Sequence, residues 1–170
     1  MGLWLLDRPG SRYRWKTASL AAMMAAGVGL LVAQVITHFW QRPRPYVAHP
    51  HETILLVPPS SEPSFPSDHA VAAFAIAFTV AFVGRGLGAL FLAAASVVSL
   101  SRVAAGLHYP GDVLGGAAIG FLSAALVLAV AGDRFPPIIA AISRVTDPVA
   151  ARGWRALDRA RERRQRQPIS

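Results

Sequence analysis

Four long apolar runs dominate this sequence and limit what it can fold into. They cover residues 17–40, 69–83, 87–105 and 113–132. A helix needs about 20 apolar residues to cross a bilayer, a length that the first and last runs meet and the other two approach with their flanks. Because only 15% of the 170 residues are charged, too little polar sequence remains to coat four such helices in a soluble globule. We therefore predict an all-α, multi-pass transmembrane helical bundle with about four spans.

The first run follows four basic residues, as the apolar part of a signal peptide would. It is longer than the roughly 7–15 apolar residues of a signal peptide, and no small-residue cleavage site closes it. We interpret it as a retained membrane anchor. The chain has no cysteine, which excludes disulfides and thiolate metal sites.

The basic residues indicate the orientation of the bundle. With the N-terminus in the cytoplasm, 14 of the 17 basic residues lie on the cytoplasmic side: four before the first run, Arg85, and nine after residue 132. Cytoplasmic segments of membrane proteins collect positive charge, so both termini are predicted to be cytoplasmic. The remaining three, Arg42, Arg44 and Arg102, are placed on the outer side with all five histidines. Arginines in that position indicate an anion to bind.

The chain divides, on this interpretation, into a membrane-embedded domain (1–132) and a basic cytoplasmic tail (133–170). The tail carries most of the net charge of +8. It suits contact with anionic lipid or serves as a topology anchor. No aromatic platform or nucleic-acid reading module accompanies the charge, so nucleic acid is not predicted as a partner.

An outer loop at 41–66 separates the first two runs and contains seven of the 13 prolines, which excludes a span there. It leads into "SFPSDHA", where Pro66 and the capping residues Ser67 and Asp68 predict a helix start. Ser67 and His69 then lie at the mouth of that helix, where free N–H groups and the helix dipole favour an anion.

The stretch "SRVAAGLHYPGD" (101–112) places His108 four residues before Asp112, in the first turn of the last helix. That spacing lets the carboxylate bind one imidazole nitrogen and leaves the other nitrogen facing outward. Each feature alone is ordinary, since such residues often only cap helices. Together, three outer segments supply guanidinium groups for phosphate and two histidines for a nucleophile and a general acid. No Asp/Glu cluster offers a metal site, so we predict phosphoryl transfer without a metal or cofactor.

The three segments resemble the signature of the type 2 phosphatidic acid phosphatase superfamily, which reads K-x6-R-P, then P-S-G-H, then S-R-x5-H-x3-D. The third motif is complete here, from Ser101 and Arg102 to Asp112. The second reads "PSDH" at 66–69, and the first ends at Arg44 with Thr37 in the lysine position. The combination is most similar to undecaprenyl-diphosphate phosphatases of the bacitracin-resistance type. The resemblance covers about residues 35–125. Family members usually carry one or two further spans before the first motif, whereas this chain begins almost directly at the helix leading into it.

The resemblance implies a role for each matching residue. His108 would attack the terminal phosphorus, Asp112 would orient it, and His69 would protonate the leaving oxygen and then activate water. The groups that would hold the phosphoryl oxygens are Arg44, Arg102, Ser67 and Ser101, with Arg42 as a hypothetical substitute for the missing lysine.

The implied function is a lipid phosphatase in the bacterial plasma membrane, with its active site facing the periplasm or the cell exterior. Its substrate would be undecaprenyl diphosphate. Two alternatives stay open. The substrate could instead be phosphatidylglycerophosphate, phosphatidic acid or another polyprenyl phosphate, or the chain could be a degenerate member that binds lipid without catalysis.

Overall fold

The structure, a computed structural model, describes residues 14–131, 135 and 139–143. The described part is helical and contains no strand. Its elements are α1 (Arg14–Phe39), α2 (Pro45–Ala48), α3 (Asp68–Val83), α4 (Arg85–Ala104) and α5 (Pro110–Ala131). Each of the four longer helices coincides with one of the predicted apolar runs to within three residues at either end. The predicted all-α transmembrane bundle is confirmed.

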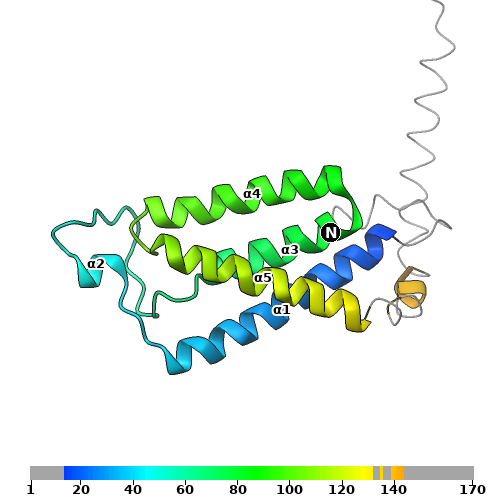
Figure 1. Cartoon of the computed structure of the whole chain (residues 1–170), viewed down its shortest axis with the longest axis horizontal. Coiled ribbons are helices and arrows are strands. Elements are labelled where there is room, and N and C mark those ends of the chain that lie inside the picture. Colours follow the sequence, from blue (N-terminus) through cyan, green and yellow to red (C-terminus); the bar gives the residue numbers. More distant parts are fainter. Residues whose placement is uncertain (1–13, 132–134, 136–138, 144–170) are drawn as a thin grey trace, which may run out of the picture. The chain divides into compact units, whose positions relative to one another are not determined.

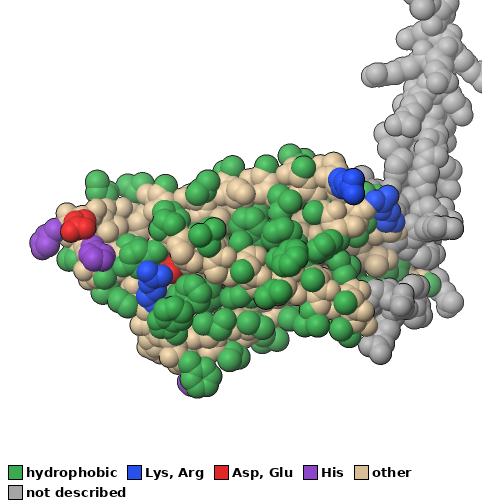
Figure 2. All heavy atoms as spheres, in the orientation of Figure 1, with side chains coloured by type: hydrophobic (Ala, Val, Ile, Leu, Met, Phe, Trp, Pro, Cys, Tyr) green, Lys and Arg blue, Asp and Glu red, His purple; other side chains and the backbone are tan. Residues whose placement is uncertain are grey.

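Three of the described helices, α1, α4 and α5, are long and apolar enough to cross a membrane. The fourth, α3, is apolar but has only 16 residues. It begins two residues after Pro66, with Ser67 at the N-cap, and it ends where Gly84 forms the C-cap. Large apolar side chains such as Leu31 (70% exposed) and Leu114 (70% exposed) point outward. Figure 2 shows apolar side chains over much of this face and basic ones near its ends, as expected of a surface in contact with lipid.

Helix α3 packs against both α4 and α5, and glycines allow the close approach. A Cβ on Gly116 of α5 would lie 2.8 Å from Ala70 Cβ and 2.9 Å from the Ser67 carbonyl oxygen. One turn later, a Cβ on Gly120 would lie 2.7 Å from the Ala75 nitrogen. The two glycines therefore lie on the face of α5 that meets the backbone of α3, as small residues at this spacing do in membranes.

The long connection between α1 and α3 lies at one end of the bundle (Figure 1). At that end α1 and α4 finish and α3 and α5 begin. The short helix α2, which the sequence did not predict, begins with Pro45 in its first turn. The Leu56 nitrogen donates to the Ala105 carbonyl at 3.3 Å, and the Ser64 nitrogen donates to the Arg42 carbonyl at 2.8 Å. These bonds fix the loop beside the α4–α5 connection, so the three motif segments are neighbours.

By its internal contacts the chain divides into two units, Leu20–Gly132 and Met1–Ser19 together with Asp133–Ser170. The first unit contains all three motif segments. In the second, Lys16 is buried and its Nζ donates to the Ser143 hydroxyl at 3.0 Å. The predicted basic tail at 133–170 lies outside the described residues, apart from residues 135 and 139–143.

Candidate active site

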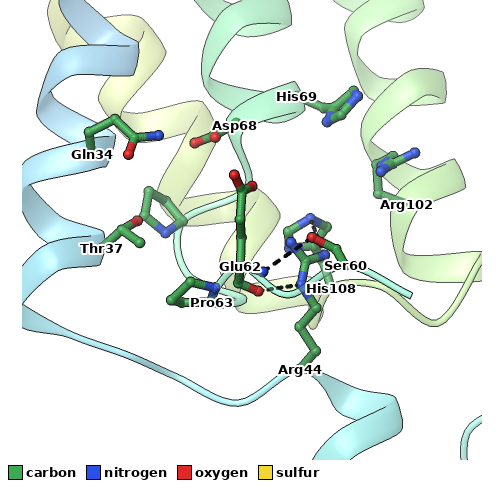
Figure 3. A pocket seen from close by; sticks show the side chains of 11 residues that line it. Gln34, Thr37, Arg44, Ser60, Glu62, Pro63, Asp68, His69, Arg102 and His108 are labelled. Atoms are coloured by element: carbon green, nitrogen blue, oxygen red, sulfur yellow. Dashed lines mark hydrogen bonds between the residues drawn. The ribbon is translucent and has the colours of Figure 1, made fainter. Parts of the chain in front are cut away.

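A pocket with a volume of about 320 Å³ lies where the outer loop meets the ends of the helices (Figure 3). Four of the predicted site residues line it, and they come from four different segments. Arg44 precedes α2, His69 is in the first turn of α3, Arg102 is in the last turn of α4, and His108 precedes α5. The remaining lining residues are Gln34, Thr37, Ser60, Glu62, Pro63, Pro66 and Asp68.

His108 is held in one orientation by the loop. Its side chain is almost fully buried, and its Nδ1 lies 2.8 Å from the carbonyl oxygen of Ser64. A carbonyl oxygen can only accept, so Nδ1 carries a proton, and in the neutral ring Nε2 is the nitrogen with the lone pair. The Nε2 atom lies 3.4 Å from Arg44 Nη1, which is long for a hydrogen bond. Nε2 of His108 is therefore next to the guanidinium group of Arg44.

Asp112 is fully buried, and its nearest partner is not His108. Its Oδ2 atom accepts from the Ser64 hydroxyl at 2.5 Å and from the Tyr109 nitrogen at 2.8 Å. Its Oδ1 atom accepts from Arg42 Nη1 at 2.8 Å. The distance from Oδ2 to His108 Nδ1 is 3.7 Å. The four-residue spacing brings the carboxylate beside the imidazole, as the sequence predicted, but Nδ1 is bonded to the Ser64 carbonyl.

The two arginines of the pocket differ in their surroundings. Arg44 is buried, with Nε donating to the Glu62 carbonyl at 2.7 Å and Nη1 to the Leu107 carbonyl at 3.3 Å. The Nε of Arg102 is buried and has no hydrogen-bond partner among the described residues. An unpaired guanidinium N–H at the wall of a pocket is costly unless a ligand satisfies it. Both arginines are therefore well placed to bind an anion.

Asp112 does not line the pocket, and neither do the other three predicted residues, Ser67, Ser101 and Arg42. Ser67 is buried at the N-cap of α3, where its hydroxyl makes no capping bond and has no partner within the described part of the chain. The side chain of Ser101 is exposed, and its hydroxyl donates to the Val98 carbonyl of the same helix at 2.7 Å. Arg42 reaches Asp112 and lies over the Tyr109 ring, 4.1 Å from its centroid. The structure thus places Arg42 beside the Asp112 carboxylate, outside the set of residues that line the pocket.

Thr37, which occupies that lysine position, also lines the pocket. Its hydroxyl donates to the Phe65 carbonyl at 3.3 Å, so it supports the loop before α3.

Sequence reasoning missed two features of this site. The first is Ser64, which contacts both His108 and Asp112. No motif marks Ser64, because a serine in a proline-rich loop is common. The second is the pair of carboxyl groups of Glu62 and Asp68, which line the same pocket as the guanidinium groups of Arg44 and Arg102 (Figure 3). Among the described residues, no three His, Asp or Glu side chains are grouped so that they could hold a metal ion.

Comparison with known proteins assigns the family. The profile of the PAP2 superfamily matches residues 16–136 of the chain. The chain belongs to this superfamily. The undecaprenyl-diphosphatase BcrC of Bacillus subtilis (strain 168) is 30% identical over 149 residues, which are 88% of this chain and 74% of that protein.

Further PAP2 relatives differ in the substrates that their names state. A decaprenylphosphoryl-5-phosphoribose phosphatase of Mycobacterium tuberculosis (strain ATCC 25618 / H37Rv) is 34% identical over 127 residues, covering 74% of this chain and 66% of that protein. Among solved structures, LpxE of Aquifex aeolicus superposes with a TM-score of 0.62 at 28% identity, over 67% of this chain and 68% of that one. The names of the two curated relatives thus state different lipid substrates.

Proposed function

We propose that this PAP2 protein is a metal-independent lipid phosphatase that converts undecaprenyl diphosphate to undecaprenyl phosphate through a phosphohistidine intermediate. One observation carries the proposal. His108, His69, Arg44 and Arg102 line a single pocket, and the bond from His108 Nδ1 to the Ser64 carbonyl makes Nε2 the nitrogen that can attack when the ring is neutral. This arrangement supplies a nucleophile, a second histidine for proton transfer and two guanidinium groups for the phosphoryl oxygens.

In the first step, Nε2 of His108 attacks the terminal phosphorus. The N–P bond forms while the bond from phosphorus to the lipid-side oxygen breaks, and His69 donates a proton to that leaving oxygen. Charge spreads over the equatorial oxygens in such a transition state, so donors that are already in place lower its energy. Arg44 is in place because two backbone carbonyls hold it. Arg102 offers an N–H group that has no other partner among the described residues.

In the second step, His69 accepts a proton from water, and the resulting hydroxide attacks the phosphorus. The N–P bond breaks, inorganic phosphate leaves, and His108 returns to its starting state. No metal ion is needed in this scheme, because the arginines neutralise the charge that a metal would otherwise balance.

Undecaprenyl diphosphate is the proposed substrate because the "RPYVAH", "SFPSDHA" and "HYPGDVLGG" segments resemble the bacitracin-resistance type of phosphatase and because BcrC is a relative over most of the chain. The phosphoribose-lipid phosphatase among the relatives supports the alternative that another polyprenyl phosphate, phosphatidylglycerophosphate or phosphatidic acid is cleaved. A non-catalytic lipid-binding protein is the second alternative. The proposed location is the bacterial plasma membrane, with the pocket facing outward.

The test is phosphate release by the purified full chain in detergent with EDTA present. Undecaprenyl diphosphate, phosphatidylglycerophosphate and phosphatidic acid are compared side by side, for the wild type and for His108→Ala. We expect metal-independent release, fastest from undecaprenyl diphosphate. Release from the His108→Ala variant should fall at least about 1,000-fold, because no other side chain can take the place of the nucleophile.

Different results would exclude different parts of the proposal. Faster release from another lipid would support the proposed phosphatase activity and exclude undecaprenyl diphosphate as its preferred substrate. Equal activity of the His108→Ala variant would exclude the phosphohistidine mechanism. A folded wild type that binds these lipids and releases no phosphate from any of them would indicate the non-catalytic alternative.

A further inference from the structure

Ser64 lies outside the family signature, yet it contacts three other residues of the candidate site. It is fully buried in the loop before α3. Its hydroxyl donates to Asp112 at 2.5 Å, and its carbonyl accepts from His108 Nδ1 at 2.8 Å. Its nitrogen donates to the Arg42 carbonyl at 2.8 Å. One small side chain and its own backbone thus connect the nucleophile, the carboxylate and the segment that carries Arg42.

The hydrogen bonds of Asp112 explain why this connection matters. Its two oxygens accept from Ser64, Arg42 and the Tyr109 nitrogen at 2.5 to 2.8 Å, whereas His108 is 3.7 Å away. Oδ2, the oxygen nearer His108, already accepts two hydrogen bonds, from the Ser64 hydroxyl and the Tyr109 nitrogen, so both of its lone pairs are used. Asp112 therefore acts on His108 mainly through Ser64, because it fixes the serine whose carbonyl holds Nδ1.

Arg42 is the second group that holds Asp112. A buried carboxylate without a cationic partner is strongly disfavoured. The guanidinium supplies that partner, and it is itself held against the Tyr109 ring. Tyr109 directly follows His108, so the same stacking contact fixes the segment that carries the nucleophile.

We propose that Ser64 and Arg42 are positioning residues, which keep Asp112 in place and hold His108 with Nε2 directed to the pocket. Neither side chain needs to touch the substrate. The inference rests on the proposed function, since it concerns the residue that would attack the phosphorus. It also assigns to Arg42 a task different from that of the lysine in the family signature.

The first test separates positioning from substrate binding. Ser64→Ala keeps the backbone carbonyl and removes only the hydroxyl, and Arg42→Gln removes the charge partner of Asp112 together with the contact over the Tyr109 ring. We expect kcat to fall about 10- to 100-fold in each variant, since small errors in the position of a reacting group have effects of this size, while KM changes less than about threefold. Ser64→Thr and Arg42→Lys keep the donors and should recover much of the activity. Matched controls are Ser96→Ala, whose hydroxyl bonds within α4, and Arg85→Gln at the far end of that helix.

The second test asks whether both residues act through Asp112. In an Asp112→Ala background, Ser64→Ala should cost less than about threefold and Arg42→Gln several-fold less than in the wild type, because the carboxylate that they hold is gone. What Arg42→Gln still costs there measures its contact with the Tyr109 ring. A serine needed only for packing would lower kcat by the same factor in both backgrounds. Thermal unfolding in detergent identifies any variant that fails to fold. If Ser64→Ala fails to fold, kcat of Ser64→Thr is compared in the two backgrounds instead.

The results also distinguish this inference from the proposed function. Wild-type kcat in both Ser64→Ala and Arg42→Gln would overturn the inference and leave the phosphatase intact. An increase in KM alone for Arg42→Gln would assign Arg42 to the substrate and also overturn it. Loss of activity in His108→Ala, measured in the same assay, shows that the proposed chemistry is being followed.

Discussion

Arg44 makes three interactions that a lysine cannot reproduce together. Its Nε binds the Glu62 carbonyl at 2.7 Å, while Nη1 lies 3.3 Å from the Leu107 carbonyl and 3.4 Å from His108 Nε2. The planar guanidinium is thus held by backbone carbonyls at Nε and at Nη1, which leaves Nη2 to bind a phosphoryl group. A lysine has a single flexible ammonium group and would lose this preorganised geometry.

We therefore predict that Arg44→Lys lowers kcat/KM about 100-fold in the phosphate-release assay, although it keeps the charge. Arg85→Lys is the matched control, because Arg85 is exposed at the start of α4, away from the pocket. Activity of Arg44→Lys within threefold of the wild type would mean that charge alone is sufficient at this position.

At the scale of single residues, the sequence predicted which side chains line the pocket better than it predicted their hydrogen-bond partners. Arginine and histidine on the outer side pointed to Arg44, His69, Arg102 and His108, and all four line one pocket. The direction of Arg42 could not be predicted, because it depends on where the buried charge of Asp112 lies in three dimensions. The hydrogen bond of Ser101 could not be predicted either, since a helical serine can donate to a carbonyl of the preceding turn instead of to a ligand.

At the scale of helices, the contact between α3 and α5 sets the position of the second histidine. The first turn of α3 carries His69, and Gly116 of α5 lies directly against that turn. A methyl group on Gly116 would meet the Ser67 carbonyl oxygen at 2.9 Å and the Val71 nitrogen at 3.1 Å. These are backbone atoms of a helix, so they cannot move aside without moving the helix.

Gly116→Ala should therefore push the start of α3 away from α5. We predict a loss of about 1–3 kcal/mol of stability, typical of overpacking, together with a lower kcat as His69 is displaced. The unfolding temperature in detergent and the phosphate-release rate measure the two effects. Gly27→Ala in α1 is the control, because a Cβ there has no neighbour within 4 Å. Equal behaviour of the two variants would mean that the α3–α5 contact tolerates a methyl group.

The helices themselves could be predicted because a bilayer demands long apolar segments. The prolines likewise predicted the outer loop, since they remove helical hydrogen bonds. The four-residue helix α2 was not predicted, because its stability comes from its surroundings. Tyr46 of α2 donates its hydroxyl to the Ser60 carbonyl at 2.6 Å and accepts from the Ser60 nitrogen at 3.0 Å. Such a contact across the loop leaves no periodic pattern in the sequence.

At the scale of the whole molecule, the remaining question is which side of the membrane the pocket faces. The unit Leu20–Gly132 has the outer loop at one end of its helices and the short α3–α4 turn at the other (Figure 1). Arg85 lies at the turn, whereas the pocket and its two carboxyl groups lie at the loop end. Of the 17 basic residues, 14 lie before the first apolar run, at this turn or after residue 132. Positive charge favours the cytoplasmic side, so we expect the turn to be inside the cell and the pocket outside. A lipid diphosphate would then be hydrolysed at the outer leaflet.

The absence of native cysteine makes this orientation directly testable. His51 in the outer loop and Gly86 at the start of α4 are both exposed, and neither lines the pocket. In spheroplasts, a membrane-impermeant maleimide should label His51→Cys at once and Gly86→Cys only after lysis. Phosphate release by both variants checks that they remain folded. Labelling of Gly86→Cys alone in intact spheroplasts would place the pocket in the cytoplasm, where the substrate would be a lipid phosphate of the inner leaflet.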